Sequence, residues 1–138
     1  MLSQQPPVAT EPELYQVFVY GSLKRGMSGH HHLEGATFLG TGITFEKYLL
    51  TSNRYPLLSK LKQVCHVKGE IYQVNKAMLD KLDEYEEVPQ YYTRETIKVR
   101  FDGNEEIKEV EVYFCEIESG QRIHETGEYL EEILDATC

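Results

Sequence analysis

One short stretch, from Val17 to Gly26, constrains the fold more than any other part of this 138-residue chain. Its first four residues, Val17 to Tyr20, are β-branched or aromatic and favour a buried strand. Gly21 follows directly, and a residue without a Cβ atom lets the backbone turn sharply and lets a ligand approach the main chain. Successive N–H groups in such a turn can form a concave anion site. The stretch therefore indicates an anion-binding loop or, more simply, a tight turn after a first strand.

Alternating and β-branched segments continue along the chain and predict a fold rich in strands. After a first strand over Tyr15 to Tyr20, we expect a bent strand pair or one strongly curved strand, then a short extended piece and three more strands. These segments cover residues 37–50, 55–58, 64–74, 92–101 and 107–117. Asp102-Gly103-Asn104 is typical of a hairpin turn between the last two. The predicted fold class is α+β, a small mixed β-barrel or curled sheet flanked by short helices.

A helix is predicted from Lys76 to about Tyr85 or Glu86, with Asn75 as its N-cap. Its apolar positions have helical spacing: Met78, Leu79, Leu82 and Tyr85. Glu86 lies four residues beyond Leu82, on the same apolar face. A carboxylate there is costly unless it is paired or useful. The alternative is that the helix has already ended and Glu86 is solvated. A second amphipathic helix is predicted from Gly127 to Ala136.

The composition and charge of the chain exclude several classes of protein. The formal net charge of −9 argues against a broad contact with nucleic acid and against docking on an anionic membrane surface. No apolar run approaches the length of a membrane span, and the N-terminus has no signal pattern. We expect residues 1–14 to be a flexible lead-in and residues 15–138 to form a single domain.

Cysteines and histidines carry little chemistry in this interpretation. Cys65, Cys115 and Cys138 are odd in number and form no CxxC pair, which favours free thiols in a reducing, cytoplasmic compartment. Three adjacent histidines, residues 30–32, point in different directions and cannot all bind one metal, so we expect them to be solvated. Neither a metal nor a cofactor is expected.

Several segments, taken in order, resemble the gamma-glutamylcyclotransferase-like superfamily, and most of all the gamma-glutamylamine cyclotransferases and their small microbial relatives. The first segment is Phe18-Val19-Tyr20-Gly21-Ser22-Leu23-Lys24-Arg25-Gly26. The others are Gly69-Glu70-Ile71-Tyr72, Leu82-Asp83-Glu84-Tyr85-Glu86 and Tyr92-Thr93-Arg94. The resemblance runs from about Val17 to Phe114 and implies a small β-barrel with a few helices.

The resemblance also implies an activity: conversion of a gamma-glutamyl amine or peptide to pyroglutamate (5-oxoproline) and a free amine, without metal or cofactor. It places the catalytic glutamate at Glu86. It places the substrate-binding residues at Tyr20, Gly21, Ser22, Leu23, Tyr92 and, with weaker support, Tyr113. The connection from Tyr55 to Val67 is shorter than in the animal gamma-glutamylamine enzymes, so the leaving amine is not predicted.

In this chemistry the substrate's α-amino group attacks its own γ-carbonyl, so positioning supplies much of the acceleration. A carboxylate must take a proton from the ammonium group and return it to the leaving amine, and burial would raise its pKa toward neutrality. The alternative is a non-catalytic module that binds gamma-glutamyl or acidic metabolites. A phosphate loop is disfavoured, because Gly26 is followed by Met27 and the G-x-x-x-x-G-K-[ST] pattern is absent.

Overall fold

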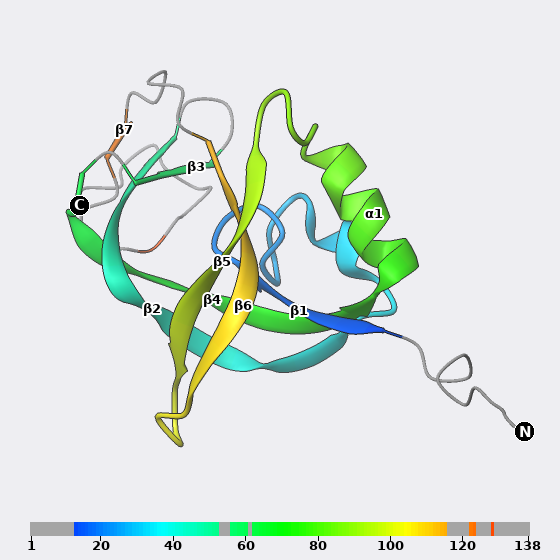
Figure 1. Cartoon of the computed structure of the whole chain (residues 1–138), viewed down its shortest axis with the longest axis horizontal. Coiled ribbons are helices and arrows are strands. Elements are labelled where there is room, and N and C mark those ends of the chain that lie inside the picture. Colours follow the sequence, from blue (N-terminus) through cyan, green and yellow to red (C-terminus); the bar gives the residue numbers. More distant parts are fainter. Residues whose placement is uncertain (1–12, 53–55, 61, 116–121, 124–127, 129–138) are drawn as a thin grey trace, which may run out of the picture.

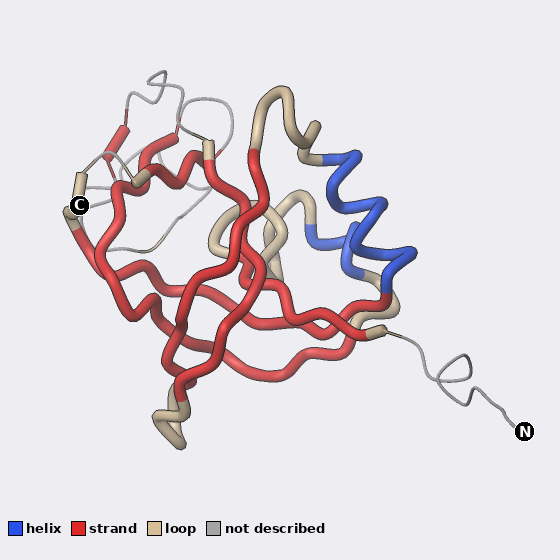
Figure 2. The backbone as a smooth tube through the Cα atoms, in the orientation of Figure 1, coloured by secondary structure: helices blue, strands red, loops and turns tan. Residues whose placement is uncertain are grey.

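The computed structural model describes residues 13–52, 56–60, 62–115, 122–123 and 128 (Figure 1). Its elements in chain order are β1 (Leu14–Val19), the 3₁₀ helix η2 (His30–Leu33), β2 (Thr37–Ser52), β3 (Pro56–Ser59), β4 (Cys65–Asn75), α1 (Lys76–Tyr85), β5 (Thr93–Phe101), β6 (Ile107–Phe114) and β7 (Arg122–Ile123). Strands dominate, and Figure 2 shows both helices on one side of them. Most of the expected lead-in and all of the expected helix over 127–136, except residue 128, lie outside the described residues.

Five strands close into a mixed barrel. Their order is β2-β4-β1-β6-β5, and β5 pairs again with β2 to complete the ring. All of these pairings are antiparallel except the one between β1 and β6, which is parallel. β3 and β7 extend the sheet from the far end of β2. The predicted fold class, a small mixed β-barrel with short helices, is confirmed.

The long strand β2 makes this closure possible. It is one curved strand of 16 residues rather than a strand pair, and its register with β4 shifts between Phe38 and Gly40 and again between Ile43 and Lys47. Such irregularities bend a strand and strengthen its twist. At Gly42, where β2 meets both neighbours, an added Cβ would lie 2.8 Å from the carbonyl oxygen of Arg100. A glycine is therefore needed at the seam of the barrel.

Two clusters of buried side chains lie on opposite faces of the strands. The inner cluster fills the barrel and includes Phe18, Val112 and Phe114. The outer cluster lies between the strands and the helices, and includes Leu79 and Leu82 of α1. Alternation along β6 and the residue after it separates the two sets: Val110, Val112 and Phe114 belong to the inner cluster, and Tyr113 and Cys115 belong to the outer one.

The helix α1 begins and ends close to the predicted residues. The side-chain oxygen of Asn75 accepts a hydrogen bond from the Met78 amide at 2.9 Å, so the predicted N-cap is confirmed. Tyr85, which the pattern places on the apolar stripe, is 40% exposed, because the helix ends there and its ring lies beside the surface histidine His32. No helix in the described part of the chain is long and apolar enough to span a bilayer.

The hairpin after β5 is confirmed, with a turn slightly longer than the predicted three residues. Gly103 and Glu105 both have positive φ, of 91° and 57°. The side-chain oxygen of Asn104 accepts a hydrogen bond from the Glu106 amide at 2.8 Å, which closes the turn locally.

Candidate active site

A cavity of about 510 Å³ opens between the end of β1, the end of α1 and β6. Its lining residues are Phe18, Val19, Tyr20, Gly21, Ser22, Leu23, Pro56, Tyr85, Glu86, Glu87, Tyr91, Tyr92 and Tyr113. All seven residues predicted for the site are among them. Their chemical roles remain predictions, but the chain brings together segments that are far apart in the sequence. This volume lies in the usual range for small-molecule sites.

The loop after β1 is held firmly in place. The Lys24 amide donates to the Gly21 carbonyl at 3.0 Å and the Gly29 amide donates to the Ser22 carbonyl at 2.8 Å. The Arg25 amide donates to the Glu70 carboxylate on β4 at 3.0 Å. Leu23 is buried beneath the loop, so the turn is anchored by backbone, carboxylate and apolar contacts together.

The end of α1 determines where Glu86 lies. The Val88 amide donates to the Asp83 carbonyl at 3.0 Å and the Glu87 amide donates to the Glu84 carbonyl at 3.1 Å, which is the Schellman pattern. Glu87 takes the left-handed position of this motif, with φ of 56°, where glycine is usually found. The chain therefore turns sharply just after Glu86, which caps the helix and lines the cavity.

Glu86 is a half-buried carboxylate. Burial raises the pKa of Glu86 to about 7. Within the described residues no side chain forms an ion pair or a hydrogen bond with this carboxylate. The alternative, a helix that has already ended and a solvated Glu86, is correct only in its first part: the helix ends at Tyr85, but Glu86 lines the cavity.

Three buried tyrosines line the cavity, and the structure shows where each hydroxyl proton goes. The Tyr20 hydroxyl donates to the Tyr113 carbonyl at 2.8 Å, and the Tyr92 hydroxyl donates to the Pro56 carbonyl. The Tyr113 hydroxyl donates to the Asp83 carboxylate at 2.7 Å. Burial, followed by smaller contributions that include the Glu86 charge, raises the pKa of all three phenols far above the usual value, so they remain neutral.

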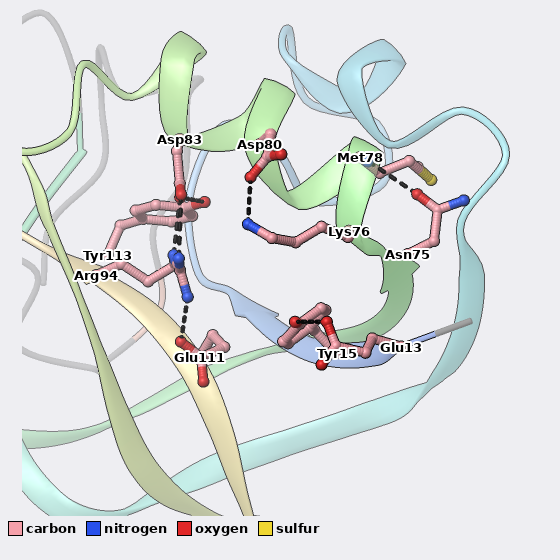
Figure 3. A network of polar contacts seen from close by, with 10 residues as sticks. All are labelled: Glu13, Tyr15, Asn75, Lys76, Met78, Asp80, Asp83, Arg94, Glu111 and Tyr113. Carbon is pink, nitrogen blue, oxygen red and sulfur yellow. Dashed lines mark hydrogen bonds and ion pairs between the residues drawn. The ribbon is translucent and has the colours of Figure 1, made fainter. Parts of the chain in front are cut away.

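A polar network lies behind Tyr113 (Figure 3). Arg94 of β5 makes two hydrogen bonds to the Asp83 carboxylate, Nε to Oδ1 at 2.8 Å and Nη2 to Oδ2 at 3.1 Å. Its Nη1 atom donates to Glu111 of β6 at 2.7 Å. The sequence patterns gave no role to Asp83 or Arg94. Arg94 stands in the quoted Tyr-Thr-Arg segment, but its partners lie 11 and 17 residues away and sequence spacing could not identify them.

Six further residues line the cavity, and the sequence analysis gave none of them a role in the site: Phe18, Val19, Pro56, Tyr85, Glu87 and Tyr91. Tyr85 extends toward the surface, where its ring stacks on His32 with centroids 3.8 Å apart. Two of the three adjacent histidines, His31 and His32, are exposed as predicted.

His30, the first of the three histidines, differs from the prediction. It is half-buried, and its Nδ1 atom donates to the Leu23 carbonyl at 2.9 Å, because the carbonyl can only accept. Among the described residues no group of three or more histidine, cysteine, aspartate or glutamate side chains is placed to hold a metal ion.

Comparison with known proteins agrees with this geometry. Residues 17–131 match the family described as gamma-glutamyl cyclotransferase, AIG2-like. A Methanocaldococcus jannaschii protein, provisionally named a gamma-glutamylcyclotransferase, is 36% identical over 114 residues, covering 82% of this chain and 93% of that protein. Gamma-glutamylaminecyclotransferase A of Danio rerio is 38% identical over 107 residues, covering 70% of this chain and 66% of that protein.

A solved structure shares the fold. The crystal structure of an AIG2-like protein from Mus musculus has a TM-score of 0.74 and is 30% identical, covering 82% of this chain and 87% of the mouse chain. The family match covers most of the chain, and it includes the loop after β1, the end of α1 and the strand that carries Tyr113. The chain therefore belongs to the gamma-glutamyl cyclotransferase, AIG2-like family and is a cyclotransferase.

Proposed function

We propose that this protein converts a gamma-glutamyl amine or gamma-glutamyl peptide to pyroglutamate and a free amine, with Glu86 as the general acid and base. The observation that carries the proposal is the Glu86 carboxylate, which lines the cavity beside the Gly21 loop and has a pKa raised to about 7 by burial. A group that titrates near the working pH can both accept and return a proton. An exposed glutamate, with the ordinary pKa of 4.5, would be a much weaker base.

The reaction moves two protons from the α-nitrogen to the leaving nitrogen and exchanges one C–N bond for another. Glu86 takes the first proton from the substrate's α-ammonium group, and the freed amine attacks the γ-carbonyl carbon of the same molecule. The new C–N bond closes the five-membered ring and gives a tetrahedral intermediate. Glu86 then returns this proton to the leaving nitrogen as the original amide bond breaks, and the second proton that the ring nitrogen must lose passes to the released amine, which departs as an ammonium ion. The nucleophile and the electrophile belong to one substrate molecule. If the protein holds that molecule in a curled conformation, the amine reacts as if it were present at an effective concentration of about 10⁵–10⁸ M.

The other lining residues suit the remaining parts of the substrate. Among the described residues that line the cavity there is no lysine, arginine or histidine, so we assign the substrate carboxylate to backbone amides of the loop after β1. The amides of Gly21, Ser22 and Leu23 would do this, and could also stabilise charge that develops on the γ-carbonyl oxygen. Tyr20, Tyr92 and Tyr113 would enclose the substrate chain. The proposal uses neither a metal nor a cofactor.

The substrate is proposed to be a small molecule, because a cavity of about 510 Å³ has the size of small-molecule sites. We also propose that the reaction takes place in the cytoplasm, because three widely spaced cysteines without a CxxC pair suit a reducing compartment.

The test is a panel of gamma-glutamyl amines and gamma-glutamyl dipeptides, incubated with the purified protein and assayed for pyroglutamate and for the released amine. Equal amounts of the two products support the proposal and identify the leaving group. Tight binding of gamma-glutamyl compounds without any pyroglutamate would instead favour a non-catalytic binding module.

A further inference from the structure

Asp83 lies behind the cavity rather than in its lining, yet it contacts the lining directly. Its Oδ1 atom accepts two hydrogen bonds, one from Arg94 Nε at 2.8 Å and one from the Tyr113 hydroxyl at 2.7 Å. Its Oδ2 atom accepts a third, from Arg94 Nη2 at 3.1 Å. Figure 3 shows the four residues Asp83, Tyr113, Arg94 and Glu111 in one continuous group.

The protons in this group can be assigned without ambiguity. An arginine side chain only donates, and a carboxylate paired with it only accepts. The single proton of the Tyr113 hydroxyl is therefore committed to Asp83. The phenol oxygen keeps acceptor capacity but has nothing left to donate. Tyr92 follows the same rule, because its proton goes to the Pro56 carbonyl.

The group is also rigid, because it is held from three elements. Asp83 comes from α1, Arg94 from β5 and Glu111 from β6. Arg94 Nη1 donates to Glu111 Oε1 at 2.7 Å, and the Thr96 hydroxyl donates to Glu111 Oε2 at 3.2 Å. The side chains of Asp83, Arg94 and Glu111 are only 21%, 25% and 22% exposed. A bidentate arginine pair in such surroundings fixes the orientation of a carboxylate as well as its charge.

We propose that Asp83 is a positioning residue: by holding the hydroxyl proton of Tyr113, it makes that phenol a hydrogen-bond acceptor for the substrate's α-ammonium group. This rests on the function proposed above. An ammonium group carries three donors and no acceptor, so it pairs with an oxygen that has no proton to offer. A phenol free to rotate would spend part of its time with its proton turned toward the substrate and would repel the ammonium group.

The groups around Glu86 are consistent with separate roles for Glu86 in proton transfer and for Tyr113 in holding the ammonium group. Tyr20, Tyr92 and Tyr113 lie close enough to Glu86 for its charge to raise their pKa values further, after burial. Glu87 lines the same cavity, and Cys115 lies near Tyr20 and Tyr92. Glu86 is thus the group that takes the proton, whereas Tyr113 would hold the ammonium in place before the transfer.

The first experiment measures kcat and KM for wild type, Asp83→Ala, Tyr113→Phe and the double variant, with γ-L-glutamyl-methylamide as substrate. Each single change should raise KM about 10- to 100-fold, the size expected for one hydrogen bond to a charged group, and change kcat less. The double variant should be no worse than Tyr113→Phe, because Asp83 acts through that hydroxyl. Additive losses would overturn the proposal. Asp80→Ala, the same substitution one turn earlier on the exposed side of α1, should match wild type.

The second experiment separates positioning from general support of the fold. Binding of γ-L-glutamyl-methylamide and of glutaryl-methylamide, which lacks the α-amino group, is measured by calorimetry in a Glu86→Gln background. The parent should prefer the amino compound, and Asp83→Ala should lose most of that preference. Equal weakening of both ligands, or no preference in the parent, would overturn the proposal. If Asp83→Ala does not fold, Asp83→Asn serves, since its neutral oxygen is a weaker acceptor and should give a smaller loss in the same direction.

The two experiments fail in different ways. If wild type binds the amino compound but makes no pyroglutamate, the proposed function is wrong. The role of Asp83 is still tested in that case, because Asp83→Ala either loses or keeps the binding preference for the compound with the α-amino group. If wild type turns over substrate but Asp83→Ala keeps the full binding preference for the α-amino compound, only the proposed role of Asp83 is wrong.

Discussion

Two carboxylates three residues apart, Asp83 and Glu86, stand in opposite surroundings at the end of the same helix. Asp83 is paired with Arg94 and accepts three hydrogen bonds. Glu86 has no such partner in the described part of the chain, and burial raises its pKa to about 7. The comparison shows how one turn of helix can supply both a carboxylate held by hydrogen bonds and a carboxylate whose pKa is raised, because the surroundings of each side chain differ.

The strongest test of this comparison is Glu86→Gln. The change removes a proton acceptor but keeps nearly the same shape, so turnover should fall about 100- to 10,000-fold while the fold is kept. Glu84→Gln, an identical substitution on the exposed side of the helix end, is the matched control and should keep wild-type turnover. Pyroglutamate formation and circular dichroism should be measured side by side for both variants.

A Glu86→Gln protein that melts normally and turns over substrate at the wild-type rate would remove Glu86 from the mechanism. The wild-type pH profile gives a second check: kcat/KM should fall as the pH drops through about 7, because Glu86 then becomes protonated.

The second prediction concerns stability against pH. The Glu86 pKa is raised by folding, from the ordinary value of 4.5 to about 7. The folded state therefore holds this proton more tightly, and the stability that it contributes is fully present below pH 4.5 and is lost as the pH rises through about 7. Gln does not titrate. The free energy of unfolding of Glu86→Gln should exceed that of wild type at pH 8, by on the order of 2 to 3 kcal/mol, and the gain should shrink toward pH 5.

Urea denaturation of both proteins at pH 5 and pH 8 measures this gain, with Glu84→Gln as the control that should show none. A gain that stays the same at the two pH values would mean that Glu86 is ionised at both, and it would contradict the contrast with Asp83.

The smallest expected effect concerns the ion pair between Asp83 and Arg94. Arg94→Ala leaves the half-buried Asp83 and Glu111 carboxylates facing one another without a cation, and should lower the free energy of unfolding by about 1 to 3 kcal/mol. Lys76→Ala breaks the exposed pair with Asp80 and should lower the free energy of unfolding much less, because water screens an exposed ion pair. Arg94→Lys keeps the charge but loses the bidentate contact with Asp83, so its free energy of unfolding should lie between those of wild type and Arg94→Ala. Equal losses for Arg94→Ala and Lys76→Ala in urea denaturation would show that the network is only a surface pair.

Local patterns were enough to predict most of the fold. The strands, the Asn75 cap and the hairpin at Gly103 depend on neighbours within a few residues, and these are visible in sequence. The Gly21 loop and Glu86 were found because each breaks a pattern: a glycine ends an apolar strand, and a carboxylate falls on an apolar face.

Contacts between distant segments were not predictable in the same way. Closure of the barrel through Gly42 and Arg100 depends on the curvature of β2, which periodicity does not report. The sequence patterns gave Asp83 no role of its own. What distinguishes it from Asp80 is its pair with Arg94 on a strand, whereas Asp80 pairs with Lys76 on the same helix. Tyr85 was misassigned because the helix ends at that residue, so its ring leaves the apolar face.

The parallel pairing of β1 with β6 has a consequence for how the site is assembled in time. Val17 pairs with Glu111, and the hydrogen bond from Tyr20 to the Tyr113 carbonyl spans 93 positions of the chain. Contacts at such separation are slow to form, because a long loop must be closed before they contribute any stability. During synthesis the loop and Glu86 are available well before Tyr113 emerges. The nascent chain therefore contains Glu86 before the cavity around it is complete, and the cavity is complete only when β6 joins β1.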